Sequence, residues 1–410
     1  MKLRDYQQEI VNKGLPLLKE YKFLYLAMEV RTGKTATSLS MVSLLPVTNC
    51  LFVTKKKAIS SIEADYKSLK HTYNLLVINY ESLHKIPSET KWDVLICDEA
   101  HTLGAFPKKS KRARQIMDIL LSHETYTILL SGTPTPESYS QMYHQVCGIS
   151  TNPFRRFKNF YAFAKTYVDV RQRKINGNYI NDYSKGKRSI IDDMKPYTIA
   201  YTQKEAGFKV ETNEKILYVD IPSAIRKLIK KLSTDRVIEG KEHVILADTA
   251  VKLMSKTHQL YSGTVKFESG HSMVLDTTKA LYIREKFKGK KIAIFYKFTA
   301  EYEAIQEIFG KSICNTLEEF STTDKNIALQ IVSGREGISL KQAEALVYYN
   351  IDFSATSYWQ SRDRMTTKNR LYNKIYWIFT KGGIEDNIYK AVVKKKDYTL
   401  NHFKKDLLTL

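Results

Sequence analysis

The segment 24–35 reads Leu-Tyr-Leu-Ala-Met-Glu-Val-Arg-Thr-Gly-Lys-Thr, and the fold prediction starts from it. The apolar run 23–27 predicts a buried parallel strand, and the periodicity after the segment predicts a helix to position 45. Between the two lies Gly33-Lys34-Thr35. This strand–loop–helix order is typical of a phosphate-binding loop, where backbone N–H groups and the helix N-terminus face the phosphates.

One position departs from the pattern G-x-x-x-x-G-K-[ST], because its first glycine falls at Met28. In such a loop, Lys34 reaches the β- and γ-phosphates and the Thr35 hydroxyl ligates Mg²⁺. Arg31 and Thr32 complete the set of nucleotide-binding residues predicted in the loop, together with the Gly-Lys-Thr triplet. The alternative is an ordinary helix start with a solvated lysine, and the rest of the chain bears on that choice.

Composition limits the partners and the compartment. The chain has 410 residues, enough for two or three domains, and its 65 Lys and Arg exceed its 43 Asp and Glu by 22 charges. Such an excess indicates a polyanionic partner. The four cysteines form no disulfide or zinc pattern. We find no signal peptide and no membrane-spanning run, so we expect a cytoplasmic protein of a bacterium or of a virus-infected cell.

Four further apolar runs in the first part of the chain alternate with helical or polar segments. They are residues 50–53, 75–78, 94–97 and 128–130. This alternation predicts βαβ units and a parallel sheet, in which ligands bind beyond the carboxyl ends of the strands.

Polar residues follow these runs where each strand is predicted to end. Asp98 and Glu99 follow the run 94–97; the first can hold Mg²⁺ and the second can orient or deprotonate an attacking water. Two adjacent acids at the end of a buried strand need a cation or a water network to satisfy them. The residues predicted to hold a nucleic-acid backbone, or to couple it to the nucleotide, are Lys55, Asn79, Tyr80, His101, Ser131 and Thr133.

These motifs resemble the first RecA-like domain of superfamily-two helicases. The matching residues are Tyr6-Gln7, the segment 28–35, Asp98-Glu99-Ala100-His101 and Ser131-Gly132-Thr133-Pro134. The chain looks most similar to the Swi/Snf-like (DEAH-box) branch, in its small bacterial or viral form. The resemblance implies a motor driven by Mg-ATP that acts on nucleic acid, usually duplex DNA, and Gln7 is the residue expected to bind the adenine edge.

The second half of the chain predicts another sheet of the same kind. Its apolar runs are residues 291–296, 327–333, 345–350 and 375–380, and a helix is predicted over 300–309 with Thr299 as its N-cap. This half has no second Gly-Lys-Thr loop. We therefore expect it to complete the nucleotide site of the first half.

Two clusters in the second half resemble later motifs of the same family. In Ser333-Gly334-Arg335-Glu336-Gly337, the glycines Gly334 and Gly337 are expected to allow close approach of a nucleic-acid backbone. Gln360 is assigned to the nucleotide, and Arg364 is the expected arginine finger. The family commonly has a second arginine at position 367, where this chain has threonine; the alternatives are Arg362, Lys368 and Arg370.

The middle of the chain is basic and aromatic. Residues 152–195 contain eleven Lys or Arg against four acids, and Arg155 and Arg156 are predicted to contact phosphates, whereas most of the aromatic residues are assigned to the core. A hairpin turn is predicted over 175–179, and a linker over 195–204.

The predicted fold is α/β, with two tandem RecA-like, doubly wound parallel-sheet domains. The predicted parts are a first RecA-like domain (1–150), a basic and aromatic insertion with linker (151–205), a helical protrusion (206–278) and a second RecA-like domain (279–410). The predicted function is an ATP-dependent helicase or translocase using ATP and Mg²⁺ on DNA, double-stranded in preference to single-stranded. The alternatives are an RNA-directed helicase and a nucleic-acid-binding protein with weak or lost ATPase activity.

Overall fold

The structure is a computed structural model, and it describes residues 2–87, 89–122, 124–175, 178–240, 243–334, 338–367 and 369–394. The chain divides into two compact units, Met1–Gly207 and Phe208–Lys394. Each contains a six-stranded sheet in which every strand pair is parallel. This arrangement confirms the predicted pair of RecA-like α/β sheets. The two units are described separately.

The sheet of unit 1 has the order β3-β2-β4-β5-β1-β8. Its strands are β1 (Phe23–Met28), β2 (Asn49–Thr54), β3 (Asn74–Asn79), β4 (Val94–Cys97), β5 (Tyr126–Leu130) and β8 (Thr198–Tyr201). All six residues of β1 are buried, as an apolar run covered on both faces requires. Every strand predicted in this half is confirmed, with ends that differ by at most two residues.

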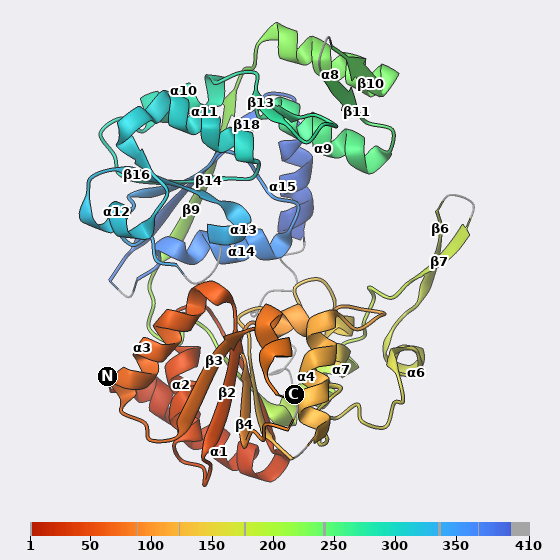
Figure 1. Ribbon diagram of the computed structural model, residues 1–410, viewed down its shortest axis with the longest axis vertical. Coiled ribbons are helices and arrows are strands. Elements are labelled where there is room, and N and C mark those ends of the chain that lie inside the picture. Colours follow the sequence, from red (N-terminus) through yellow and green to blue (C-terminus); the bar gives the residue numbers. More distant parts are fainter. Residues whose placement is uncertain are drawn as a thin grey trace. The chain divides into compact units, whose positions relative to one another are not determined.

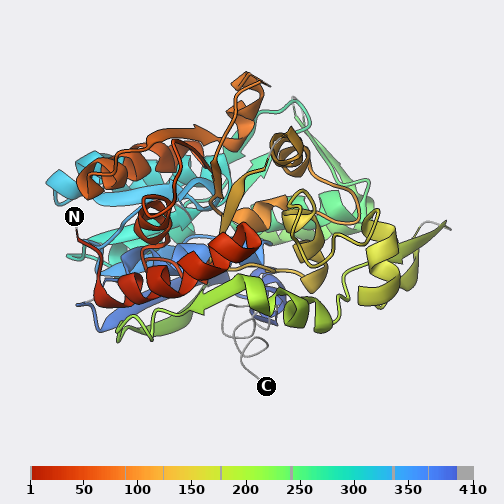
Figure 2. The ribbon, with the colours of Figure 1, turned by 90° about the horizontal axis from the view of Figure 1, so that it is seen from below.

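Helices cover the sheet of unit 1 (Figure 1). They include α1 (Asp5–Tyr21), α2 (Lys34–Val42), α3 (Ile59–Leu69), α4 (Lys111–Ser122) and α5 (Met142–Val146). Helix α2 ends before the predicted position 45. Figure 2 shows α1, in red, running across this unit; its residues Ile10, Val11 and Leu18 are buried in the same core cluster as the β1 residues Leu24 and Leu26.

The basic and aromatic segment packs onto unit 1 through α6 (Phe160–Tyr167) and α7 (Ser189–Met194), joined by the antiparallel pair β6 (Arg171–Ile175) and β7 (Asn178–Asp182). Phe154, Phe160, Phe163 and Tyr167 are buried, so their assignment to the core is confirmed. The segment 195–204 contains β8, which pairs with β1 and completes the sheet. Four residues of the predicted linker are thus part of the first sheet, and the assignment of the segment as a linker stays a prediction.

The sheet of unit 2 has the order β15-β16-β14-β17-β18-β9. Its strands are β9 (Glu211–Val219), β14 (Ile292–Tyr296), β15 (Ile313–Cys314), β16 (Asn326–Gln330), β17 (Ala345–Tyr348) and β18 (Tyr372–Thr380). The helices beside it are α10 (Thr278–Lys286), α11 (Thr299–Phe309), α12 (Leu317–Thr322), α13 (Ile331–Gly334), α14 (Ala355–Arg362) and α15 (Glu385–Lys394).

Two local predictions in unit 2 were wrong. The run 327–333 is a strand only to Gln330, after which α13 begins. Thr299 is the first residue of α11, and the Glu301 carboxylate accepts the N–H groups of Lys297 and Phe298, so an acid inside the first turn satisfies the helix start.

The segment expected to be a helical protrusion has mixed structure. It contributes β9 to the sheet, and then forms α8 (Ser223–Asp235), β10 (Val237–Glu239), β11 (Val244–Leu246), α9 (Ala250–Tyr261), β12 (Thr264–Lys266) and β13 (Ser272–Val274). Ile225, Ile229, Leu232 and Leu260 belong to a separate core cluster there. Among the described residues, no helix has both the length and the apolar content needed to cross a membrane.

Candidate functional site

The loop between β1 and α2 has the geometry of a phosphate-binding loop. Met28 is the last residue of β1 and pairs with Tyr201, so the strand occupies the place where the motif usually has its first glycine. Gly33 precedes α2 with φ of +82°. A Cβ at that position would lie 1.9 Å from Gln7 Nε2. The backbone angle therefore favours glycine at position 33, and a larger residue would also displace the Gln7 side chain.

Helix α1 holds the loop from one side. Gln7 Nε2 lies 3.4 Å from the Thr32 carbonyl oxygen and 3.5 Å from that of Gly33, and the Tyr6 hydroxyl donates to Thr32 O at 3.1 Å. Gln7 Oε1 accepts the Arg4 N–H at 2.9 Å. In this structure Gln7 contacts the loop backbone, and its role toward adenine stays a prediction.

The residues after β8 hold the loop from the other side, which sequence reasoning missed. The Gln203 N–H donates to Glu29 Oε2 at 2.7 Å, and Gln203 Nε2 donates to the Val30 carbonyl at 2.9 Å. The Tyr201 ring stacks on Tyr6, with 5.2 Å between the ring centroids. The only sequence signal for this contact is that polar residues follow a short apolar run. That run lies in the segment predicted to be a linker.

Asp98 lies beyond the carboxyl end of β4 and near Lys34. Thr54 Oγ1 donates to Asp98 Oδ2 at 2.9 Å, and the Glu99 N–H donates to Asp98 Oδ1 at 3.0 Å. Burial and the charge of Glu99 raise the pKa of Asp98 to about 6, while the Lys34 ammonium acts in the opposite direction. Sheet topology thus brings together residues that are distant in sequence.

This donor set fits a magnesium ion bound with phosphates. The pKa of the buried Asp98 carboxyl is raised even with Lys34 nearby, and a hard divalent cation binds carboxylate and hydroxyl oxygens. Asp98 and the Thr35 hydroxyl are the residues that would hold it, and Lys34 with the loop N–H groups would hold the phosphates.

A second chain of polar contacts runs from Glu99 toward β5. Glu99 has φ of +49° and precedes a short 3₁₀ helix, Ala100–Leu103. Its Oε2 lies 3.4 Å from His101 Nδ1, which is 3.0 Å from Ser131 Oγ. Ser131 Oγ accepts the Thr133 N–H at 3.1 Å. The acid expected to act on water is therefore linked to the turn after β5, where coupling residues were predicted.

The residues predicted to contact nucleic acid differ in accessibility. Tyr80 is fully buried, and its hydroxyl donates to the Asp98 carbonyl at 2.6 Å, so its ring is not exposed to a nucleic acid, and its coupling role stays a prediction. Lys55 follows β2 and Asn79 is the last residue of β3, and both are partly exposed. Arg155 and Arg156 are exposed; Arg156 also donates to the Tyr167 hydroxyl at 3.1 Å.

In unit 2 the predicted arginine finger is largely buried. Arg364 is 7% exposed, and its Nε donates to the Gln360 carbonyl at 2.7 Å. Arg362 forms an ion pair with Glu214, and the Arg370 guanidinium donates to backbone carbonyls, including that of Ala343 at 2.8 Å. These contacts give Arg362 and Arg370 structural roles within unit 2 and argue against either as the second finger.

The two glycines predicted to allow close approach of a nucleic-acid backbone, Gly334 and Gly337, have different outcomes. A Cβ at Gly334 would lie 2.6 Å from Phe295 Cε1, so glycine is needed there to pack against β14. Gly337 lies outside the described residues, as does Lys368.

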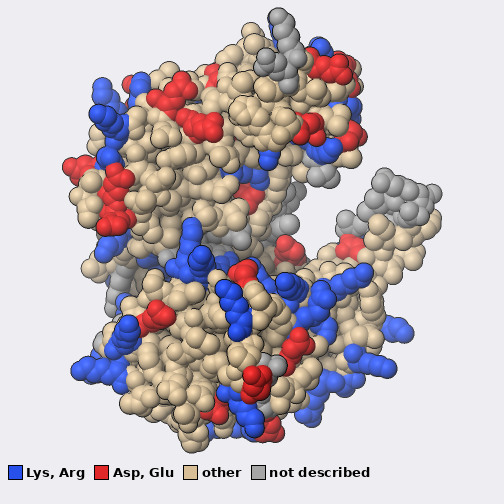
Figure 3. All heavy atoms as spheres, viewed as in Figure 1, with Lys and Arg blue, Asp and Glu red and all other residues tan. Residues whose placement is uncertain are grey.

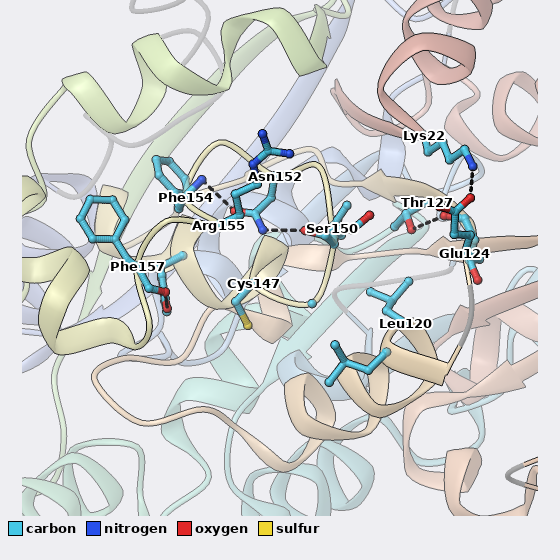
Figure 4. A pocket seen from close by; sticks show the side chains of 15 residues that line it. Lys22, Leu120, Glu124, Thr127, Cys147, Ser150, Asn152, Phe154, Arg155 and Phe157 are labelled. Carbon is cyan, nitrogen blue, oxygen red and sulfur yellow. Dashed lines mark hydrogen bonds and ion pairs between the residues drawn. The ribbon is translucent and has the colours of Figure 1, made fainter.

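A sizeable pocket in unit 1 lies away from this site. It has a volume of about 480 Å³, and Lys22, Thr127, Cys147 and Phe154 are among its lining residues (Figure 4). Lys22 and Thr127 lie at the amino ends of β1 and β5, whereas Lys34 and Asp98 follow carboxyl ends. Lys22 and Glu124 form an ion pair at this pocket. We assign no part of the nucleotide site to it.

The fold and the site define a class, that of P-loop proteins with two RecA-like sheets, as in helicases and translocases. A family model, the SNF2-related domain, matches residues 42–262, and the chain belongs to this family. This membership, together with the phosphate loop, supports an ATP-hydrolysing enzyme.

Curated relatives are distant and longer. A SWI/SNF-related matrix-associated actin-dependent regulator of chromatin subfamily A-like protein 1 from Xenopus laevis is 21% identical over 341 residues, which cover 78% of this chain and 34% of the relative. A Drosophila melanogaster homolog of the subfamily A protein containing DEAD/H box 1 is 21% identical, with 80% and 49% covered. The chain thus spans a third to a half of the length of these relatives.

Among solved structures, the SWI2/SNF2 ATPase core of Sulfolobus solfataricus in complex with dsDNA is similar to this chain. It is 15% identical, with 100% of this chain and 95% of that chain covered, at a TM-score of 0.43.

Proposed function

We propose that this chain is an ATP-dependent translocase that acts on DNA, in its double-stranded form. The observation that carries the proposal is the grouping of Lys34, Asp98 and Glu99 at the carboxyl edge of the first sheet, in a member of the SNF2-related family. The net charge of +22 supports a polyanionic partner.

In the proposed reaction, Lys34 and the N–H groups before α2 bind the phosphates, while Thr35 and Asp98 hold the metal. Bound Mg²⁺ neutralises negative charge on the phosphates. Glu99 orients a water and takes its proton, and its contact with His101 holds the carboxylate in place. We propose that the Arg364 guanidinium neutralises negative charge on the transferred phosphoryl group.

Coupling to DNA is proposed to run through the turn after β5. His101 contacts Ser131, and Ser131 holds the backbone of Thr133. A change at Glu99 during hydrolysis can therefore move a turn at the edge where Lys55 and Asn79 also lie. Contacts of this kind fall on phosphates, so we propose little sequence preference.

Steady-state ATP hydrolysis, measured with double-stranded DNA, single-stranded DNA and RNA, tests the proposal. We expect the largest stimulation with duplex DNA, and we expect Lys34→Ala to reduce turnover by at least about 100-fold, because it removes the charge that holds the transferred group. Lys19→Ala, an exposed lysine on α1, is the matched control and should change nothing. Equal turnover in Lys34→Ala and the parent would refute the motor, and stimulation by RNA alone would favour the RNA-directed alternative.

A further inference from the structure

The hairpin β6–β7 stands away from the sheet of unit 1 (Figure 1). Its five residue pairs run from Arg171 opposite Asp182 to Ile175 opposite Asn178. Tyr179 is 70% exposed and Ile180 is 50% exposed. Because neighbouring residues of a strand point to opposite faces, one large apolar side chain is accessible on each face of the ribbon.

The base of the hairpin is fixed to the unit. The ladder continues below it, where the Lys187 N–H donates to the Tyr167 carbonyl at 2.7 Å and the Asp169 N–H donates to that of Lys185 at 2.9 Å. Tyr167 is buried, and the Tyr183 ring packs edge-on against Phe160. The exposed apolar side chains are therefore carried on a stem that is anchored in the core.

The surroundings of the hairpin are strongly basic. Residues 155–188 contain ten Lys or Arg and only two acids. Lys158, Lys165, Arg171, Lys185 and Arg188 are all exposed. On the face drawn in Figure 3, blue basic side chains lie around the base of the hairpin. This charge favours a nucleic acid over a protein with an apolar surface as the partner.

From these observations we propose that the β6–β7 hairpin binds unpaired bases where a DNA duplex opens into single strands. An exposed tyrosine beside cations is the arrangement on which bases stack while phosphates are held. An intact duplex offers a side chain mainly base edges, whereas an open junction offers the face of a base. The hairpin therefore distinguishes a forked DNA from a continuous duplex, with Tyr179 and Ile180 on the bases and Arg171 on a phosphate. This inference rests on the proposed function for the identity of its polynucleotide.

Equilibrium binding of the full chain without nucleotide tests the proposal. Fluorescence anisotropy compares a forked DNA having two unpaired arms with a blunt duplex of equal length, at one salt concentration. We expect the fork to bind at least about fivefold more tightly, the lower end of what stacking of one base provides. The double variant Tyr179→Ala/Ile180→Ala should lose this preference and keep the affinity for the blunt duplex.

The matched control is Leu121→Ala, because Leu121 lies in the same unit and is 69% exposed. It should retain the preference for the fork. Arg171→Gln should weaken binding to both DNAs and lower the salt slope by about one. Equal binding of both DNAs by the parent chain, or a fork preference that survives in the double variant, overturns the inference.

The outcome is separable from that of the proposed function. A fork preference that disappears in the double variant supports the hairpin, even if DNA fails to stimulate ATP hydrolysis. Conversely, stimulation by duplex DNA with no fork preference supports the motor and overturns the role of the hairpin.

Discussion

At the scale of single residues, the pKa of the Asp98 carboxyl group links the site to the pH dependence of folding stability. Its pKa is raised from 3.8 to about 6, mainly by burial and by Glu99. The folded state therefore holds a proton that the unfolded state has lost between these two pH values. Because the unfolded state binds fewer protons there, stability must fall as pH rises from about 4 to 6.

We predict that the ligand-free protein loses on the order of 2–3 kcal/mol of unfolding free energy over this pH range relative to Asp98→Asn. Asparagine has nearly the same shape and does not titrate, so subtracting its profile removes the contributions of other groups. Urea unfolding at several pH values measures the difference. Parallel profiles for the two proteins would contradict the raised pKa.

At the scale of elements, the phosphate loop is fastened by α1 and by the residues after β8. Gln203 forms two hydrogen bonds to the loop, through its backbone to Glu29 and through its side chain to Val30. Gln203→Ala removes the second bond only. Since one such bond contributes about 1 kcal/mol, we predict about a fivefold weaker affinity for ATP.

Titration with a fluorescent ATP analogue measures this loss. Gln8→Ala is the control, because Gln8 pairs with Asn12 on the exposed side of α1 and does not contact the loop. An unchanged nucleotide affinity in Gln203→Ala would show that the hydrogen bond from the Gln203 side chain to Val30 does not help to hold the loop ready for nucleotide binding.

At the scale of the whole molecule, the excess of 22 positive charges should make the proposed binding to DNA depend on salt. If six to ten cations contact phosphates, affinity should fall by about 10³–10⁵-fold between 50 and 200 mM salt, because bound counterions are released. Anisotropy measured over a salt series gives the slope directly. A flat dependence would mean that the positive charge does not contact the polynucleotide.

Sequence alone determined the local elements around the site. The apolar runs at β1, β2, β3, β4 and β5 predict parallel strands, of which β3 at the sheet edge is only partly buried, and the spacing of Gly33, Lys34 and Thr35 predicts a loop before a helix. These features depend on side-chain periodicity and on backbone restrictions, both of which are local. The apolar runs of the second half predicted the second sheet in the same way.

Tertiary structure decided which residues meet. Asn79 ends β3 and Tyr80 follows it, yet the Tyr80 ring is buried and its hydroxyl donates to the Asp98 carbonyl. Gln203 reaches the phosphate loop because β8 pairs with β1; paired residues such as Ala27 and Ala200 are 173 positions apart in the chain. Burial and long-range pairing depend on the packing of the whole unit, and no local pattern contains that information.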